Sequence, residues 1–132
     1  MNIEKNYDLS FPLEKVYATW ISSDTVIAPA TSMDILPKLG GHYRLVVDTP
    51  EFKGKNEGVF LLVDPNCHLC YTWEWNNDGE VSEIDVNFSA TGKGTAIRIL
   101  HSGFVNQASA DRHDQGWDSY IEGFKLFLSK AV

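Results

Sequence analysis

The hydrophobic positions of this chain change their period along its length. From residue 42 to residue 101 they mostly alternate with polar residues, which is the period of half-buried strands. From residue 108 onward they recur at intervals of three and four, which is the period of an amphipathic helix. The helical stripe comprises Trp117, Tyr120, Ile121, Phe124 and Leu128. The pattern predicts a long C-terminal helix packed on the face of an antiparallel sheet.

Six strands are predicted in all. They cover roughly residues 2–9, 42–48, 58–63, 69–76, 84–88 and 97–101. Turn-forming sequences such as Asp-Pro-Asn at 64–66 and Asn-Asp-Gly at 77–79 separate them. Two short helices are predicted after the first strand, at about 12–22 and 24–27, followed by a loop over 28–39. The fold class is therefore α+β, with a curved six-stranded antiparallel sheet and its helices on one face.

Residues with short polar side chains mark where the predicted helices begin. Ser10 precedes Pro12, which suits the first turn of a helix, so Ser10 is the predicted N-cap of the first helix. Ser109 or Asp111 is the predicted cap of the long C-terminal helix. Lys125 and Lys130 lie near the other end of that helix, where the helix dipole favours positive charge.

Length and charge narrow the class of protein. A chain of 132 residues fits one domain spanning residues 1–132. The net charge is −7 and no run of Lys or Arg occurs, so nucleic acid and anionic membranes are not expected partners. Neither a signal-peptide pattern nor a long uncharged apolar stretch appears, so we expect a cytoplasmic protein.

The two cysteines form a Cys-x-x-Cys motif at Cys67 and Cys70. A zinc site requires a second pair of ligands at comparable spacing, and a redox motif requires the pair at the start of a helix. Neither condition is met in the sequence, because Cys70 opens a predicted strand. We therefore expect no metal ion and no other cofactor.

Aromatic residues are more frequent in this chain than in an average globular protein. Four Trp, five Tyr and seven Phe are present, and many fall on the inward face of the predicted sheet or helix. A dry core penalises every unpaired hydroxyl or ring N–H by about 1–3 kcal/mol. So many amphipathic rings on one concave face indicate either a cavity that holds ligand or water, or a solid core whose polar tips reach backbone groups.

Several short motifs in order along the chain resemble a known family. They are Gly40, Gly41, Tyr43 and Arg44; Gly58, Val59 and Phe60; Tyr71, Thr72 and Trp73; His101, Ser102, Gly103 and Phe104; and His113, Gly116 and Trp117. Together they resemble the homologues of the activator of the ninety-kilodalton heat-shock protein ATPase, a family of the START-like (SRPBCC) superfamily. The resemblance implies the helix-grip fold, in which a curved sheet grips a long C-terminal helix. It does not imply a chaperone role, because the amino-terminal domain of the eukaryotic co-chaperone has no counterpart here.

The resemblance also implies an apolar cavity between the sheet and the C-terminal helix, used across the superfamily for small hydrophobic molecules. Binding of such a molecule is the expected function. The residues expected around the cavity are Trp20, Met33, Tyr43, Leu45, Phe60, Tyr71, Trp73, Val86, Phe88, Ile97, Ile99, His101, Phe104, Trp117, Tyr120 and Phe124. The loop 28–39 either acts as a mobile lid through Met33, opposite residues 104–108, or is an ordinary connection whose Met33 and Ile35 fill the core.

Two other functions stay open. His101 and His113 are expected to meet where the last strand ends and the long helix begins, and His101 with a nearby carboxylate could drive a weak cyclase, dehydratase or hydrolase step. The simpler interpretation is that both histidines hydrogen-bond loop backbone. Alternatively, the chain is an interaction module that forms a homodimer through sheet edges or loops, because the outer sheet face is expected to be acidic.

Overall fold

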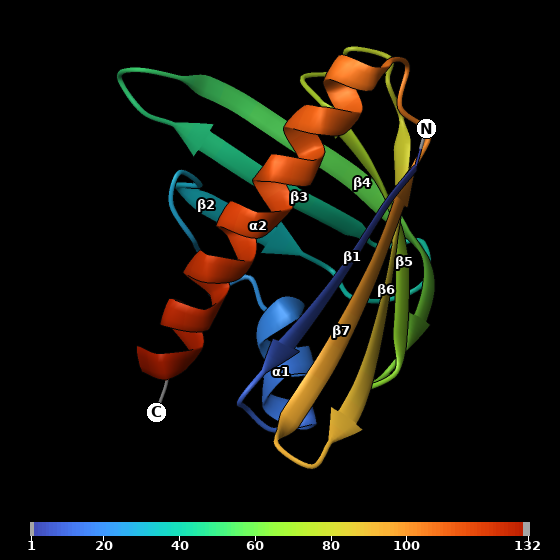
Figure 1. Ribbon diagram of the computed structural model, residues 1–132. Coiled ribbons are helices and arrows are strands. Elements are labelled where there is room, and N and C mark those ends of the chain that lie inside the picture. The colour runs from blue at the N-terminus through green and yellow to red at the C-terminus, as the bar shows by residue number, and fades with distance from the viewer. Residues whose placement is uncertain (1, 131–132) are drawn as a thin grey trace.

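A seven-stranded sheet wraps around two helices (Figure 1). The computed structural model describes residues 2–130. In chain order its elements are β1 (Asn2–Leu9), α1 (Leu13–Trp20), β2 (Ser32–Ile35), β3 (His42–Asp48), β4 (Lys53–Asp64), β5 (His68–Trp75), β6 (Ser82–Thr91), β7 (Gly94–Ser102) and α2 (Gln107–Lys130). The predicted α+β class, the antiparallel pairing and the long C-terminal helix are confirmed.

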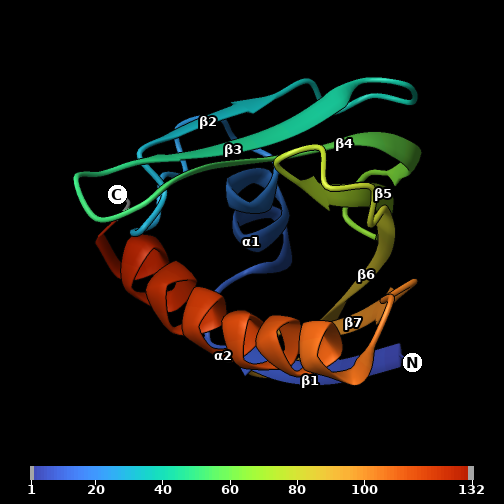
Figure 2. The ribbon, with the colours of Figure 1, turned by 90° about the horizontal axis from the view of Figure 1, so that it is seen from above.

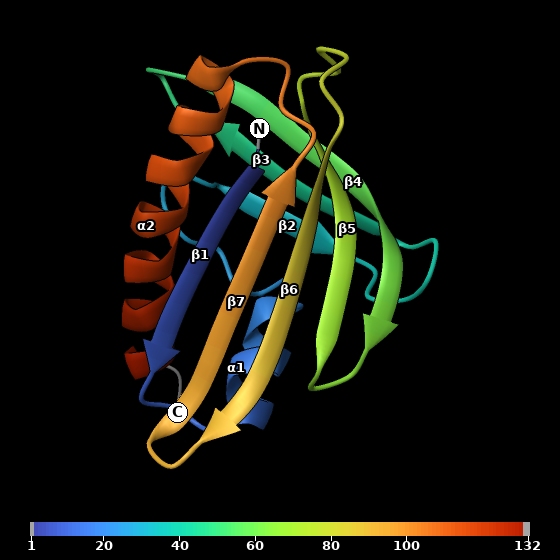
Figure 3. The ribbon, with the colours of Figure 1, turned by 45° about the vertical axis from the view of Figure 1, so that its right-hand side comes forward.

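The strands lie in the order β1-β7-β6-β5-β4-β3-β2, with every neighbouring pair antiparallel. The sheet curls so strongly that α2 crosses its open side while α1 lies inside the curve (Figure 2). Figure 3 shows the outer face, where β1, β7, β6 and β5 follow one another. This curvature creates a concave space between the sheet and α2.

The prediction of six strands was wrong by one. Residues 32–35, expected to belong to a loop, form β2 and pair with β3 from Ser32 opposite Val46 to Ile35 opposite Tyr43. The segment has two prolines beyond its ends, and its polar and apolar residues alternate over only four positions, which is too short to distinguish a strand from a loop. Backbone hydrogen bonds to the neighbouring strand decide its conformation.

Strand β4 also begins earlier than predicted. Residues 49–57 lie between two predicted strands, but only Thr49 to Phe52 form a turn, closed by mutual bonds between the Thr49 hydroxyl and the Phe52 backbone. Lys53 then pairs with Asp48, and the ladder continues through Asn56 opposite Leu45. Glycine and charged residues concealed this half of the strand, because they leave it without an apolar alternation.

Helix α2 buries the predicted stripe. Trp117, Ile121, Phe124 and Leu128 are buried, and Tyr120 is half-buried beside them. The helix begins two residues before Ser109, and the cap is Asn106, whose side-chain oxygen accepts a hydrogen bond from the Ser109 backbone N–H at 2.9 Å. Asparagine is a favourable N-cap, so the predicted caps Ser109 and Asp111 were misplaced within the first turn.

Helix α1 is shorter than predicted and stands alone. It runs from Leu13 to Trp20, and Pro12 occupies the N-cap position without a side-chain capping bond, in place of the predicted Ser10. Residues 24–27 form no helix. Instead Ile27 lies against α2 where a Cβ at Gly123 would come within 2.5 Å of Ile27 Cγ2, so tertiary contact fixes this segment.

The core lies between the sheet and both helices and is rich in ring contacts. Trp20 of α1 is 1% exposed and meets Phe88, Trp117, Tyr120 and Phe124 with ring centroids 5.2–6.1 Å apart. Its indole N–H donates to the Tyr71 hydroxyl at 3.3 Å. Among residues 2–130, no helix has the length and apolar character needed to cross a membrane.

Candidate ligand cavity

A cavity of about 500 Å³ lies between α2 and the inner face of β3 and β5. The segment that follows α1 forms one wall, and the connection between β5 and β6 forms another. Its lining consists of Ile27, Ala28, Pro29, Ala30, Tyr43, Leu45, Val47, Tyr71, Trp73, Trp75, Asp78, Glu80, His101, Arg112, His113, Gly116, Trp117, Ser119 and Tyr120. The lining is mainly apolar and aromatic, with charged groups gathered near the β5–β6 connection and the start of α2.

The structure brings some of the predicted cavity residues to this wall. They are Tyr43, Leu45, Tyr71, Trp73, His101, Trp117 and Tyr120. The others lie outside the lining, namely Trp20, Met33, Phe60, Val86, Phe88, Ile97, Ile99, Phe104 and Phe124. The strand residues among these were placed by side-chain parity, which identifies the inner face and gives no information on which part of that face is already filled. Met33 and Phe104 were placed from the loops expected to frame the cavity mouth.

Helix α1 explains most of the difference. It packs inside the curve against β6 and β7, where Trp20 contacts Phe88 and Phe124. The inner residues of that half of the sheet are therefore packed in the core and do not line the cavity. Met33 is partly buried against the same core, and Phe104 belongs to a separate small cluster with Ile3 and Ala110.

Half of the lining residues that the sequence did not reveal come from irregular segments, and the other half come from β3, β5 and α2. Ile27, Ala28, Pro29 and Ala30 line the cavity from the stretch before β2, and Asp78 and Glu80 do so from the β5–β6 connection. Their only local signal was the Asn-Asp-Gly turn sequence at 77–79. Val47 and Trp75, by contrast, share the inward parity of their strands and could have been included.

His101 is held by hydrogen bonds on both ring nitrogens. The Trp117 indole N–H donates to His101 Nδ1 at 3.1 Å, and His101 Nε2 lies 2.7 Å from the Ser82 hydroxyl. The Ser82 hydroxyl donates its own proton to the Trp73 carbonyl at 3.1 Å. His101 Nε2 must therefore carry the ring proton, which fixes a neutral imidazole with Nδ1 as acceptor.

Burial also favours the neutral form of His101. His101 is 1% exposed, and desolvation, with a further contribution from His113, lowers its pKa to about 3. A general base needs a free lone pair and a pKa close to the working pH. His101 has neither, so its role in this geometry is to orient the Trp117 indole and to join α2 to the sheet.

The acidic groups of the wall are engaged by the backbone. Glu80 accepts hydrogen bonds from the Val105 N–H and the Ser109 hydroxyl, both at 2.7 Å, and the Val105 bond is the main reason that its pKa is lowered. Asp78 accepts the Glu80 backbone N–H at 2.8 Å. Glu80 therefore ties the β5–β6 connection to the start of α2, and Asp78 closes a turn within that connection.

The basic groups nearby are less engaged. His113 Nδ1 donates to the Ser109 carbonyl at 2.8 Å, which leaves Nε2 for another partner. Within residues 2–130, no hydrogen bond or ion pair is formed by the Arg112 guanidinium, which nevertheless lies close enough to Glu80 to help lower the pKa of that carboxyl. One end of the cavity therefore combines a cation with a ring nitrogen.

A buried amide lies behind the aromatic wall. Asn56 is fully buried and is paired with Leu45 on one side and Trp75 on the other, both of which line the cavity. Neither amide atom of Asn56 has a hydrogen-bond partner among the described residues. Buried polar atoms seldom lack partners, so this amide is a second polar feature close to the apolar wall.

Comparison with solved structures identifies the fold. The chain is 21% identical to protein MLL2253 from Mesorhizobium loti, with a TM-score of 0.85 and coverage of 100% of this chain and 99% of that chain. It is 18% identical to an AHSA1-like protein from Aeromonas hydrophila, with a TM-score of 0.81 and coverage of 98% and 92%. DynU16, a putative protein in the dynemicin biosynthetic locus, is 14% identical, with a TM-score of 0.82 and coverage of 98% of this chain and 47% of that chain. At these identities the likeness establishes the fold alone.

Comparison with sequence families gives a more specific result, whereas no match is found among curated proteins. The model of the family described as "Activator of Hsp90 ATPase homolog 1-like protein" matches residues 10–129. That match spans α1, all of the strands after β1 and nearly all of α2, and it confirms the resemblance carried by the sequence motifs. The chain therefore belongs to the Activator of Hsp90 ATPase homolog 1-like family.

Proposed function

We propose that this protein binds a small amphipathic molecule in the cavity between the sheet and α2. The observation that carries the proposal is the cavity itself, whose volume of about 500 Å³ falls within the usual range for small-molecule sites. The family relationship supports it, because proteins of this fold commonly bind hydrophobic ligands.

The aromatic wall defines the apolar part of the ligand. Tyr71, Trp73, Trp75, Trp117 and Tyr120 present ring surfaces from β5 and from α2. Flat ring faces in an open, partly desolvated space favour stacking with another aromatic or conjugated system. A molecule with a planar apolar body fits this wall better than a strongly hydrated one.

The charged end defines the polar part of the ligand. Glu80 and Asp78 are engaged by backbone groups, whereas Arg112 has no hydrogen-bonded partner in the part of the chain that the structure describes. The Arg112 guanidinium therefore offers free donors at this end of the cavity. We infer that the ligand carries an acidic or hydrogen-bond-accepting group that faces Arg112.

The catalytic alternative receives no support from the site. It depended on His101 as acid or base, and both nitrogens of that ring are occupied.

Dimerisation stays a prediction that light scattering at several ionic strengths can test. The outer face is less uniformly acidic than expected, because Val59, Leu61 and Leu62 of β4 are more than a third exposed.

Gly116 offers a direct test of the cavity. It lies on α2 in the cavity lining, and a Cβ at this position would meet no atom within 4 Å. Gly116→Phe is expected to place a ring in the cavity and to weaken binding of the fluorescent probe anilinonaphthalene sulfonate by about tenfold or more, a loss of about 1.4 kcal/mol. Probe fluorescence during titration measures the affinity.

Gly116→Ala is the matched control. It should stabilise α2 by about 1 kcal/mol, because glycine is a poor helix former, while leaving the affinity for the probe almost unchanged. Thermal unfolding followed by circular dichroism checks that both variants are folded. Equal probe affinity of the Phe and Ala variants would show that the probe binds elsewhere and would contradict the proposal.

Arg112→Gln tests the polar end of the ligand site. The variant is expected to weaken binding of anilinonaphthalene sulfonate, an anion, by up to about fivefold, because an exposed ion pair contributes roughly 0.2–1 kcal/mol. Binding of the neutral probe Nile red should not change. A parallel loss for both probes would mean that Arg112 shapes the wall and does not select for charge.

A further inference from the structure

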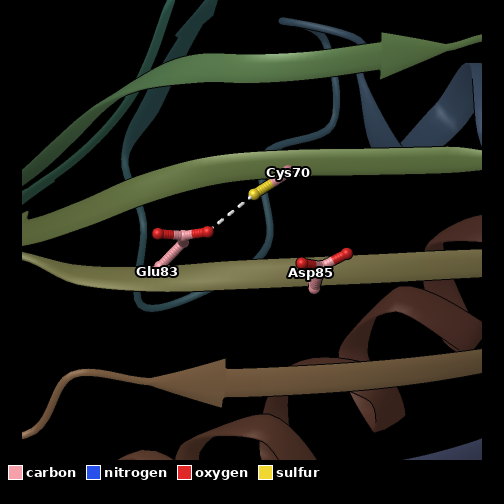
Figure 4. Close-up of side chains that lie close together, drawn as sticks. All are labelled: Cys70, Glu83 and Asp85. Carbon is pink, nitrogen blue, oxygen red and sulfur yellow. Dashed lines mark hydrogen bonds between the residues drawn. The ribbon is translucent and has the colours of Figure 1, made fainter.

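A second cluster of reactive side chains lies on the opposite, outer face of the sheet. Cys70 of β5 and Glu83 and Asp85 of β6 each bring one ligand atom within 4.8 Å of the others (Figure 4). Cys70 is paired directly with Asp85 across the two strands. Because Tyr71 points into the cavity and strand residues alternate, Cys70 points outward.

His68 adds an imidazole to the same cluster. It precedes Cys70 by two residues on β5, so it shares the outer face. Its Nε2 contacts the Asp85 carboxylate directly. The four side chains thus come from two adjacent strands, two residues apart on each: His68 and Cys70 from β5, and Glu83 and Asp85 from β6.

We propose that His68, Cys70, Glu83 and Asp85 form a binding site for Zn²⁺ on the outer face of the sheet. Sulfur, imidazole nitrogen and carboxylate oxygen are the three donor types that zinc uses in proteins, and four ligands complete its tetrahedral shell. Donors around a tetrahedral zinc are separated by about 3.3–3.8 Å, given bonds of about 2.0–2.3 Å. Cys70, Glu83 and Asp85 already have ligand atoms within 4.8 Å of one another, whereas His68 contacts Asp85 and has to turn toward the other two side chains to complete the shell.

The electrostatics of the cluster favour a cation. Cys70 is 7% exposed, and its Sγ donates a hydrogen bond to Glu83 at 3.2 Å. In the part of the chain that the structure describes, no lysine or arginine forms an ion pair with either carboxylate. A divalent ion supplies the missing positive charge, and coordination displaces the thiol proton to solvent.

The position of the cluster allows an ion to reach it. Glu83 is exposed and the Asp85 side chain is 33% exposed, so the site opens toward solvent on the convex side. The neighbouring strand β6 thus supplies the second pair of ligands. Cys67 is exposed in the preceding turn and is not one of the four proposed ligands. Sequence spacing could not show this, because the pairing register of β5 with β6 brings the four residues together.

Cobalt binding provides the test, since Co²⁺ occupies zinc sites and reports a bound thiolate by a charge-transfer absorption band. The full chain, first treated with EDTA, should bind one equivalent of Co²⁺ with such a band, and Zn²⁺ should remove it by displacement. Cys70→Ser should lose the band. Cys67→Ser, the matched control, should keep it.

A second variant covers the case in which Cys70→Ser fails to fold. Asp85→Asn, at a partly exposed position, should weaken Co²⁺ binding by about tenfold or more while circular dichroism stays unchanged. Absence of the band in the wild-type chain, loss of the band in Cys67→Ser, or unchanged affinity in Asp85→Asn would each overturn the proposal. The cavity probe reports on the other face of the sheet, so these outcomes are independent of the proposed ligand binding.

Discussion

Trp20→Ala is expected to lower the free energy of unfolding by about 3–5 kcal/mol, the usual cost of removing a buried large aromatic side chain. The indole is 1% exposed, makes ring contacts with Phe88, Trp117 and Phe124, and donates a hydrogen bond to Tyr71. Its removal opens a void between α1 and α2 and leaves the Tyr71 hydroxyl without that donor. Among residues 2–130, no other single side chain joins both helices to the sheet through so many rings.

Urea unfolding followed by far-ultraviolet circular dichroism measures this change, since loss of a tryptophan alters the fluorescence itself. Trp75→Ala is the matched comparison, because Trp75 is half-buried at the end of β5 and borders the cavity. It should cost much less than Trp20→Ala, as one side of its ring already faces open space. Equal costs for the two variants would show that the cavity wall is packed like the core.

Acidification from pH 7.5 to pH 5 is expected to remove about 2 kcal/mol of stability through His101 alone. Burial lowers the pKa of His101 from 6.5 to about 3 in the folded protein. Below pH 6.5 the unfolded chain therefore binds a proton that the folded chain does not. The contribution of His101 to the free energy of unfolding is fully present above pH 6.5. It is lost as the pH drops toward 3, by up to about 1.4 kcal/mol per pH unit.

The pH dependence of unfolding in wild type and His101→Gln isolates this contribution. Glutamine retains an acceptor for the Trp117 indole N–H and a donor toward Ser82, but it has no proton to take up in this range. Carboxyl groups with lowered pKa values, such as Glu80 and Glu57, add their own loss mainly below pH 5. Identical slopes between pH 6.5 and pH 5 in both proteins would mean that His101 is not held neutral.

The elements that the sequence predicted well are those with a strong period. Residues 117–128 repeat at helical spacing and residues 43–47 alternate, so burial of one face determines their conformation whatever they pack against. The segments that it predicted poorly are β2 and the first half of β4. Both are stabilised by backbone pairing with β3, but β2 alternates over only four residues and the first half of β4 has no apolar residue, so neither shows a clear strand period.

The candidate cavity shows the same division. Parity placed Tyr43, Tyr71 and Trp73 on the inner face correctly. It placed Phe88 and Ile97 on the same face, and it could not show that these two are packed in the core. Only the position of α1 inside the curve decides which inner residues are packed and which face open space. The polar end escaped prediction because Glu80 and Arg112 are distant in sequence and meet through the β5–β6 connection.

The sequence by itself determined the α+β class, the long helix and the inward side of most strands, because hydrophobic burial imposes a period on each element locally. It also carried the family motifs, which the family match over residues 10–129 confirmed. The tertiary structure decided where the concave face stays open and which hydrogen bonds hold His101 in its neutral form. It also decided which side chains of β5 and β6 lie together on the outer face. Those features depend on strand register and on how the helices fill the curve, and both are set by contacts between residues far apart in the chain.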